Sequence, residues 1–241
     1  MKILLAFTDE NVELGTMEMT QLLGMNKATI SRIVSSLLDY GFLSRNPQTR
    51  KFRLGSSIVR LGLAVNRSVK KNMVFVAKPF IDRLRDDIDE TVVLNIRFGK
   101  DIIVSYIADN RRRLRVNIEL GEISPPHAGA SGKAIYAFMP KPFVEELFSR
   151  QLPRLTPNTM TDPEELKTQF EIIRERGYAF DKEEVEPGFN AVASPVFDFE
   201  GNPIAAVGVV GISPGISSWE DDHPIIPLLK EIAREISERL Y

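Results

Sequence analysis

Residues 16–54 decide the fold of the N-terminal part of this chain, and their sequence is TMEMTQLLGMNKATISRIVSSLLDYGFLSRNPQTRKFRL. Thr16 is expected to cap a short helix that Gly24 ends. Asn26 is expected to cap a second helix, Lys27–Tyr40, because an asparagine side chain accepts free N–H groups of a first helical turn. The apolar residues of this second helix recur at helical spacing; they are Ile30, Ile33, Val34, Leu37 and Leu38. Two short helices across a tight glycine-containing turn are typical of a helix-turn-helix.

Two short alternating segments, Phe42–Arg45 and Lys51–Leu54, follow the second helix and flank the polar turn NPQTR. This pattern predicts a β-hairpin with a basic tip, a wing that lays cations beside the phosphate backbone or in a minor groove. Taken alone, the polar side of the second helix fits an ordinary solvated face equally well. With the wing, residues 1–54 are predicted to be a winged helix-turn-helix DNA-binding domain.

The expected DNA-binding residues are polar or basic and lie on the second helix or the wing. Thr29 and Arg32 are expected to contact bases, because base edges are reached from the first turns of a recognition helix. Ser31 belongs to the same hydrogen-bonding face. Phosphate contacts are expected from five residues: Asn26, Lys27, Arg45, Arg50 and Lys51.

The charge of the chain is unevenly distributed. Residues 1–71 hold eleven Lys and Arg against five Asp and Glu, whereas residues 72–241 hold 20 basic and 28 acidic residues, for a net charge of −2 overall. A basic N-terminal segment joined to an acidic C-terminal segment indicates a nucleic-acid-binding domain attached to a domain that does not bind nucleic acid. Chance asymmetry of surface charge is the alternative, and the placement of the cations on the predicted wing weakens it.

Composition excludes several classes of protein and site. The 241 residues are 43% hydrophobic and 27% charged, which is a globular mixture with room for one large or two smaller domains. No apolar run approaches the roughly 20 residues of a membrane span, and the N-terminus lacks a secretory cleavage signal. With no cysteine and two histidines, neither disulfides nor a metal site is expected, and no cofactor is expected. The chain is therefore expected to be cytoplasmic.

The rest of the chain predicts a linker helix at 55–71 and an α+β domain at 72–241, with an antiparallel sheet covered by helices on one side. The expected strands are Thr91–Phe98, Asp101–Ala108, Leu114–Leu120, Asn190–Phe197 and Pro203–Gly211. The expected helices are Met73–Asp87, Gly132–Phe138, Pro142–Arg150, Asp162–Arg176 and Pro224–Tyr241.

No convincing catalytic motif occurs in the acidic C-terminal segment, residues 72–241. The loop Gly129–Lys133 fits neither a phosphate-binding loop nor a nucleophile elbow. It can hold an anion on free N–H groups, or it is simply a tight turn that lets a helix approach the sheet. His127 is expected to bond to backbone. Glu183 and Glu184 are expected to be solvated, unless one of them caps a pocket. No catalytic residue is assigned.

Several motifs together resemble the IclR family of transcription regulators along nearly the whole chain. The matching pieces are residues 24–32, 40–43, 52–55, His127 with 131–134, residues 176–184 with Gly188, and residues 193–198 with Gly201 and Pro203. The resemblance implies a winged helix, a linker helix, a GAF-like effector domain, and dimers often paired into tetramers. It also implies that residues 1–7 are a shortened first helix.

The resemblance further implies an effector pocket. By position, that pocket would involve Ala130, Ser131, Asp181, Ala191, Gly208 and Val210. The last three are small or apolar, which favours a ligand with an apolar part, such as an organic acid or an aromatic metabolite. The expected function is a sequence-specific regulator that binds a pseudo-palindromic operator in double-stranded DNA. An enzyme with a DNA-binding appendage and a purely architectural DNA binder are the alternatives.

Overall fold

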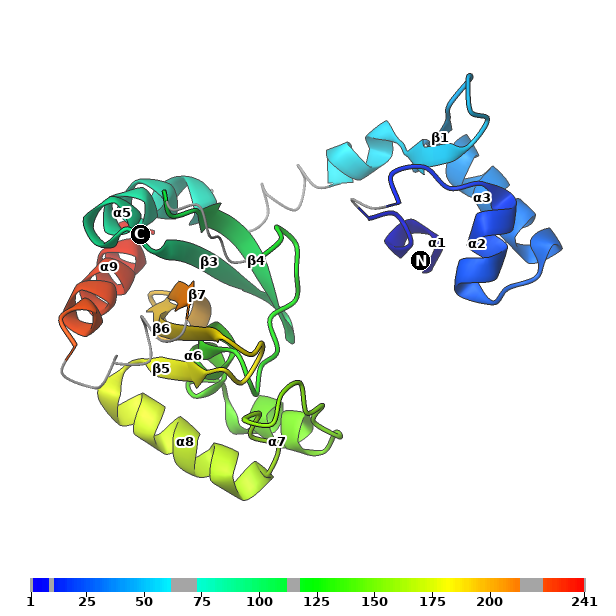
Figure 1. Cartoon of the computed structure of the whole chain (residues 1–241). Coiled ribbons are helices and arrows are strands. Elements are labelled where there is room, and N and C mark those ends of the chain that lie inside the picture. The colour runs from blue at the N-terminus through cyan, green and yellow to red at the C-terminus, as the bar shows by residue number, and fades with distance from the viewer. Residues whose placement is uncertain (1, 9–10, 62–72, 112–117, 213–222, 241) are drawn as a thin grey trace. The chain divides into compact units, whose positions relative to one another are not determined.

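The computed structural model describes residues 2–8, 11–61, 73–111, 118–212 and 223–240. The chain divides into two compact units, Met1–Asn72 and Met73–Tyr241. Figure 1 shows them as a small unit coloured blue to cyan and a larger unit coloured green to red. Each unit has a hydrophobic core of its own.

The N-terminal unit is a helix-turn-helix followed by a two-stranded hairpin, as predicted. Its elements are α1 (Lys2–Leu5), α2 (Thr16–Leu23), α3 (Lys27–Asp39), β1 (Leu43–Arg45) and β2 (Phe52–Leu54). The core takes side chains from every one of these elements and from the loops between them: Ile3, Ala6, Leu14, Met19, Ile30, Val34, Leu43 and Phe52. Burial of these apolar groups is the main term that stabilises so small a unit.

The ends of α2 and α3 follow local sequence signals, with one correction. The side chain of Asn26 accepts the N–H of Thr29 at 2.8 Å, which confirms its capping role, and Gly24 ends α2 in the left-handed conformation. The predicted cap at Thr16 is wrong, because Gly15 is the extended residue before the helix. Its N–H donates to the Glu18 carboxylate at 2.6 Å, so Glu18 caps this helix end instead.

The hairpin is joined by a third piece of extended chain. β1 and β2 pair antiparallel, and Leu14 exchanges two backbone hydrogen bonds with Phe52, at 2.9 and 3.0 Å. After the hairpin in the chain, residues 56–61 are helical. The remainder of the predicted linker, 62–71, lies outside the described residues.

The C-terminal unit is built on a five-stranded antiparallel sheet in the order β4-β3-β7-β6-β5. The strands are β3 (Thr91–Phe98), β4 (Asp101–Ala108), β5 (Ala179–Lys182), β6 (Phe189–Phe197) and β7 (Pro203–Ile212). Four of them were predicted, whereas β5 was missed because its four residues are too few to show an alternating pattern. Residues 118–120 of the predicted strand Leu114–Leu120 are not strand, and 114–117 lie outside the described residues.

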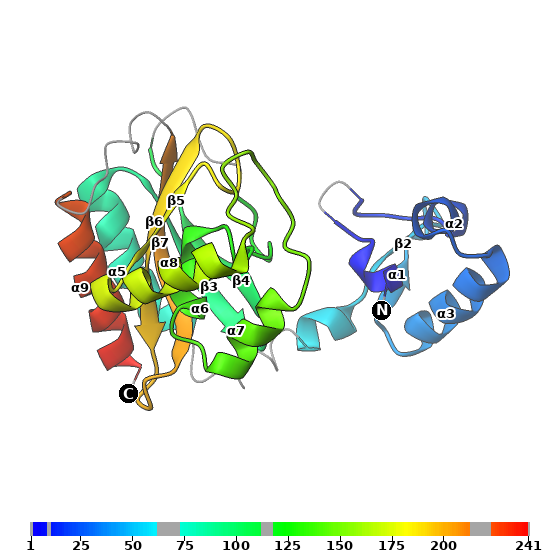
Figure 2. The ribbon, with the colours of Figure 1, turned by 90° about the horizontal axis from the view of Figure 1, so that it is seen from below.

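Helices cover both faces of this sheet, so the prediction of a single covered face is wrong. The long helices α5 (Met73–Ile88) and α9 (Ile225–Arg239) share one core with the sheet. The helices α6 (Ala130–Tyr136), α7 (Lys141–Phe148) and α8 (Pro163–Arg176) share another core with the opposite face. Figure 2 shows the sheet between these two groups of helices. Consecutive side chains of a strand point to opposite faces, so the first six residues of β3 are all buried.

Candidate DNA-binding face and effector pocket

The recognition helix α3 presents its polar side to solvent. Ile30 and Val34 are buried in the domain core, whereas Lys27, Ser31 and Arg32 are exposed on the other side. Asn26 at the cap is exposed and Thr29 is half-buried. The side chains predicted to touch DNA from this helix are therefore on the accessible face, and their contacts with bases and phosphates stay predictions.

The wing is held in shape by hydrogen bonds to Glu13, in the segment that precedes α2. Glu13 accepts from the Asn46 amide at 2.6 Å and from the Thr49 hydroxyl at 2.7 Å. These two bonds lower the pKa of the Glu13 carboxyl. Arg50 takes a positive φ of 59° at the turn, and its carbonyl accepts from Arg45 Nε at 3.1 Å.

Lys51 differs from the other predicted phosphate contacts. Its ammonium is 2.6 Å from the Glu18 carboxylate, and both side chains are only part-exposed, at 41% and 44%. An ammonium that already has a carboxylate partner has less to gain from a phosphate. Arg45 and Arg50 are exposed, and so is Arg53, which the prediction omitted although it lies on the same hairpin.

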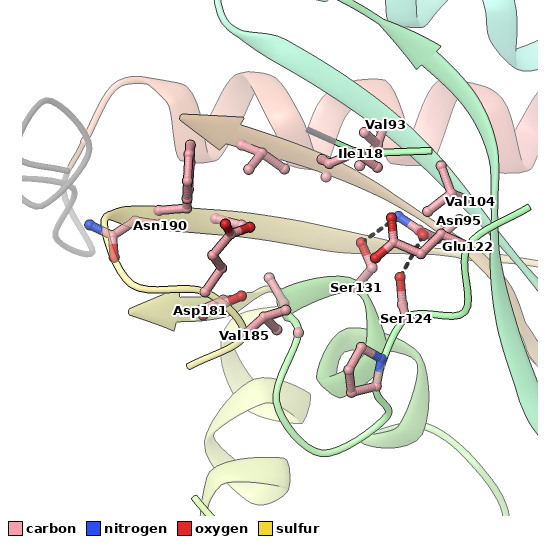
Figure 3. Close-up of a pocket in the computed structure, with 18 residues that line it drawn as sticks. Val93, Asn95, Val104, Ile118, Glu122, Ser124, Ser131, Asp181, Val185 and Asn190 are labelled. Carbon is pink, nitrogen blue, oxygen red and sulfur yellow. Dashed lines mark hydrogen bonds between the residues drawn. The ribbon is translucent and has the colours of Figure 1, made fainter. Parts of the chain in front are cut away.

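In the C-terminal unit, a cavity of about 120 Å³ lies between the sheet and the N-terminal end of α6. All six residues carried over from the family resemblance line it: Ala130, Ser131, Asp181, Ala191, Gly208 and Val210. Twelve further residues complete the lining: Val93, Asn95, Val104, Ile118, Glu122, Ser124, Pro125, Gly129, Val185, Glu186, Phe189 and Asn190. Figure 3 shows this lining.

One end of the cavity carries a chain of hydrogen bonds between neutral side chains. The Asn95 amide donates to the Ser131 hydroxyl at 2.8 Å, and the Ser124 hydroxyl donates to the Asn95 carbonyl at 2.9 Å. Asn95 is only 2% exposed and sits inside an otherwise apolar stretch of β3. A lone polar residue in an otherwise apolar strand is the sequence signal for this end of the pocket, but Asn95 was not among the predicted pocket residues.

The opposite end of the cavity carries Asp181 and Asn190 (Figure 3). Asp181 is buried, and its carboxylate accepts the N–H of Glu184 at 2.7 Å. Burial raises the pKa of Asp181 to about 7, although backbone hydrogen bonds and the charge of Lys133 act in the other direction. Asn190 is also buried, and within the described part of the chain its Oδ1 has no hydrogen-bond partner.

The predicted glycine-rich loop Gly129–Lys133 is mostly the first turn of α6, and it serves packing more than anion binding. A Cβ on Gly132 would lie 2.2 Å from the carbonyl oxygen of Pro125, so no larger residue fits there. The Lys133 ammonium is already paired with the Glu184 carboxylate in a buried ion pair, so it is not available to a bound anion. Its side chain is 3% exposed and that of Glu184 is 12% exposed. The prediction that Glu184 is solvated is therefore wrong.

The last candidates from the sequence are His127 and possible metal ligands. His127 is buried and its Nε2 lies 2.8 Å from the Pro153 carbonyl oxygen, which confirms a backbone-bonded histidine. Among the described residues, no group of acidic residues and histidines has the arrangement of a metal site. Within the same residues, no helix is long and apolar enough to cross a membrane.

Comparison with known proteins agrees with this architecture. The family model described as the bacterial transcriptional regulator IclR C-terminal domain matches residues 66–238, and the IclR helix-turn-helix model matches residues 1–47. The chain belongs to the IclR family. Its members are transcriptional regulators rather than enzymes, and this chain has the DNA-binding helix-turn-helix of that family.

Individual relatives of this IclR-family regulator cover most of its length. KdgR of Dickeya chrysanthemi is 29% identical over 233 residues, 96% of this chain and 75% of the relative. BhcR of Paracoccus denitrificans is 33% identical over 195 residues, 80% of this chain and 69% of the relative.

Solved structures show the same fold. Thermotoga maritima IclR is 28% identical with a TM-score of 0.74, covering 99% of this chain and 96% of that one. An IclR homologue of Microbacterium hydrocarbonoxydans, complexed with 4-hydroxybenzoate, has a TM-score of 0.83 at 24% identity and covers 99% and 96% of the two chains. At that identity the likeness concerns the fold alone.

Proposed function

We propose that this IclR-family regulator binds its operator through residues 1–54, and that residues 55–71 link this domain to a sensing domain at 72–241. A small effector held in the cavity beside Ser131 and Asp181 modulates the operator affinity. The observation that supports this most directly is the convergence on one cavity of all six residues carried over from the family. A typical coupling between two such sites changes affinity about 5–150-fold.

The cavity suits a small ligand. A volume of about 120 Å³ is comparable with the engineered cavity of about 150 Å³ that binds benzene. The middle of the lining is apolar and both ends are polar, so a single ring or a short hydrocarbon with polar ends would fit. This size agrees with an aromatic or short-chain metabolite.

We further propose a homodimer or tetramer on a pseudo-palindromic operator in double-stranded DNA. Two recognition helices related by a two-fold axis read half-sites about one helical turn apart, or a multiple of that spacing. The family membership supports this arrangement. The architectural alternative predicts a sensing domain without a ligand-sized cavity, and the cavity beside Ser131 weighs against it.

Replacing Arg32 by alanine tests the DNA-binding face. We expect binding to DNA sequences selected by the wild-type protein to weaken by about 1–3 kcal/mol, with relaxed sequence preference, because a base contact is lost. Arg45→Ala should instead weaken all DNA alike and reduce the salt slope by about one ion. Lys51→Ala should have a smaller effect on that slope, because Glu18 already neutralises Lys51.

The measurement is a fluorescence-anisotropy titration of selected and random duplexes at several salt concentrations. Arg239→Ala is the matched control, since Arg239 is an exposed arginine near the end of α9. If Arg32→Ala binds selected and random duplexes just as the wild type does, the recognition surface is assigned wrongly.

A further inference from the structure

We propose that Glu13 and Glu18 determine the specificity of DNA binding, because they cancel the positive charge on one face of the wing and so suppress sequence-independent binding through that face. This inference rests on the proposed function, since it concerns how the same winged helix-turn-helix distinguishes its operator from other DNA. Neither carboxylate was among the residues that the sequence predicted to act in DNA binding.

The two faces of the wing differ in composition. Leu14 pairs with Phe52 beside the β1–β2 hairpin, and the side chains of Leu14, Leu43 and Phe52 are buried in the domain core. Successive side chains of extended chain point to opposite faces, so the neighbours of Leu43 and Phe52 belong to the other face. We call this face the outer wing face, and its members are Ser44, Lys51 and Arg53. The bond from Arg53 Nε to the Ser44 hydroxyl, at 3.2 Å, agrees with this placement.

Both cations of the outer wing face lie near a carboxylate. The Lys51 ammonium is 2.6 Å from the Glu18 carboxylate. Hydrogen bonds from the wing turn are the main cause that lowers the pKa of the Glu13 carboxyl, and the charges of Arg53 and Lys51 lower it further. Two carboxylates therefore face two cations, and their charges cancel.

The two carboxylates are held in place by other hydrogen bonds. Glu18 accepts the N–H of Gly15 at 2.6 Å. Glu13 accepts from Asn46 at 2.6 Å and from Thr49 at 2.7 Å. A phosphate that approaches Lys51 therefore meets a fixed carboxylate beside the ammonium, and the repulsion of like charges offsets the attraction.

The available positive charge is concentrated elsewhere in this domain. Lys27 and Arg32 are exposed on α3, and Arg45 and Arg50 are exposed at the wing turn. Phosphate contacts supply most of the affinity for random DNA, whereas a recognition helix in the groove reads the sequence. Specificity is the difference between these two affinities. Cancelling cations on a face that reads no base lowers the affinity for random DNA and spares the contacts of α3.

Charge-neutral variants test this role. Glutamine keeps an acceptor oxygen and suits the same position in a capping box, so Glu18→Gln and Glu13→Gln should fold as the wild type does. For each variant we expect the Kd for random duplexes to tighten about fivefold at low salt, with a salt slope steeper by about one ion. The Kd for duplexes selected by the wild type should change by less than about twofold, so the ratio of the two affinities falls.

The measurement is a fluorescence-anisotropy titration of the whole chain between about 50 and about 200 mM salt. The double variant Glu18→Gln with Lys51→Ala should return to the wild-type affinity for random duplexes, because a carboxylate and its ammonium partner are lost together. Asp39→Asn removes an exposed carboxylate at the end of α3. It controls for the net charge of the domain and should leave the ratio unchanged. Glu171→Gln, which removes an exposed carboxylate on α8, should change nothing.

Several results would overturn this role. Equal tightening for selected and random duplexes would show that the carboxylates limit all DNA binding without affecting specificity. A double variant that keeps the gain would show that it does not come from Lys51. An unchanged ratio in either single variant removes that residue from the proposal. If the wild type selects no sequence at all, the proposed function fails as well, whereas a selective wild type with two unaltered variants contradicts only the role of Glu13 and Glu18.

Discussion

Replacing Lys133 by alanine is expected to destabilise the C-terminal domain by about 3–5 kcal/mol, because it leaves a buried carboxylate without its partner. The Lys133 side chain is 3% exposed and the Glu184 side chain 12% exposed. The second oxygen of Glu184, Oε2, already lacks a hydrogen-bond partner within the described part of the chain. The variant therefore removes the main interaction that compensates for burying this charge.

Urea unfolding followed by circular dichroism measures this effect. The double variant Lys133→Met with Glu184→Met should recover most of the loss, because apolar replacement of a buried pair is often neutral or stabilising. Lys167→Ala is the matched control. It breaks the surface pair of Lys167 with Glu164, at 2.6 Å and 49% and 80% exposed, which should cost about 1 kcal/mol or less. Equal losses in Lys133→Ala and Lys167→Ala would show that the buried pair has no special weight.

Replacing Asp181 by asparagine is expected to stabilise the protein at neutral pH and to change little at about pH 4. Burial raises the pKa of Asp181 from its ordinary value of 3.8 to about 7 in the folded state. Between these two values the folded protein holds a proton that the unfolded chain has lost, so the wild type loses stability as the pH rises through this window. The full difference corresponds to roughly 4 kcal/mol at most, and it stays constant above about pH 7.

The measurement is the difference in unfolding free energy between Asp181→Asn and wild type, from denaturant titrations at several pH values. Taking the difference cancels the titration of other carboxylates, including Glu146, whose pKa is lowered by hydrogen bonds from Lys100 and Arg150. Glu171→Gln should give a flat, near-zero difference. A flat difference for Asp181→Asn as well would mean that Asp181 titrates normally in the folded protein.

Much of the architecture was predictable because its signals are local. The cap at Asn26, the left-handed Gly24 and the apolar spacing of α3 depend on residues within a few positions of each other, and they define the recognition helix. The strands β3, β4, β6 and β7 showed clear β patterns and were predicted. The short β5 was not, since four residues give too short a pattern to distinguish a strand from a loop.

The pocket was predictable only through the family resemblance, and then only in part. That resemblance supplied six of the lining residues, including Asp181 and Ser131. It did not supply Asn95, Glu122 or Glu186, and it suggested no charge for the lining. Glu122 lies far along the chain from Asp181 and Glu186, so their shared cavity could not be predicted from spacing.

The sequence by itself determined the helix-turn-helix, the wing and the contrast in charge between the basic residues 1–71 and the acidic residues 72–241. All three depend on composition and on neighbouring residues. The tertiary structure decided that helices cover both faces of the sheet, that Lys51 pairs with Glu18, and that Lys133 is buried against Glu184. These outcomes depend on which distant side chains meet when the core forms, and desolvation then sets the energy of each buried charge.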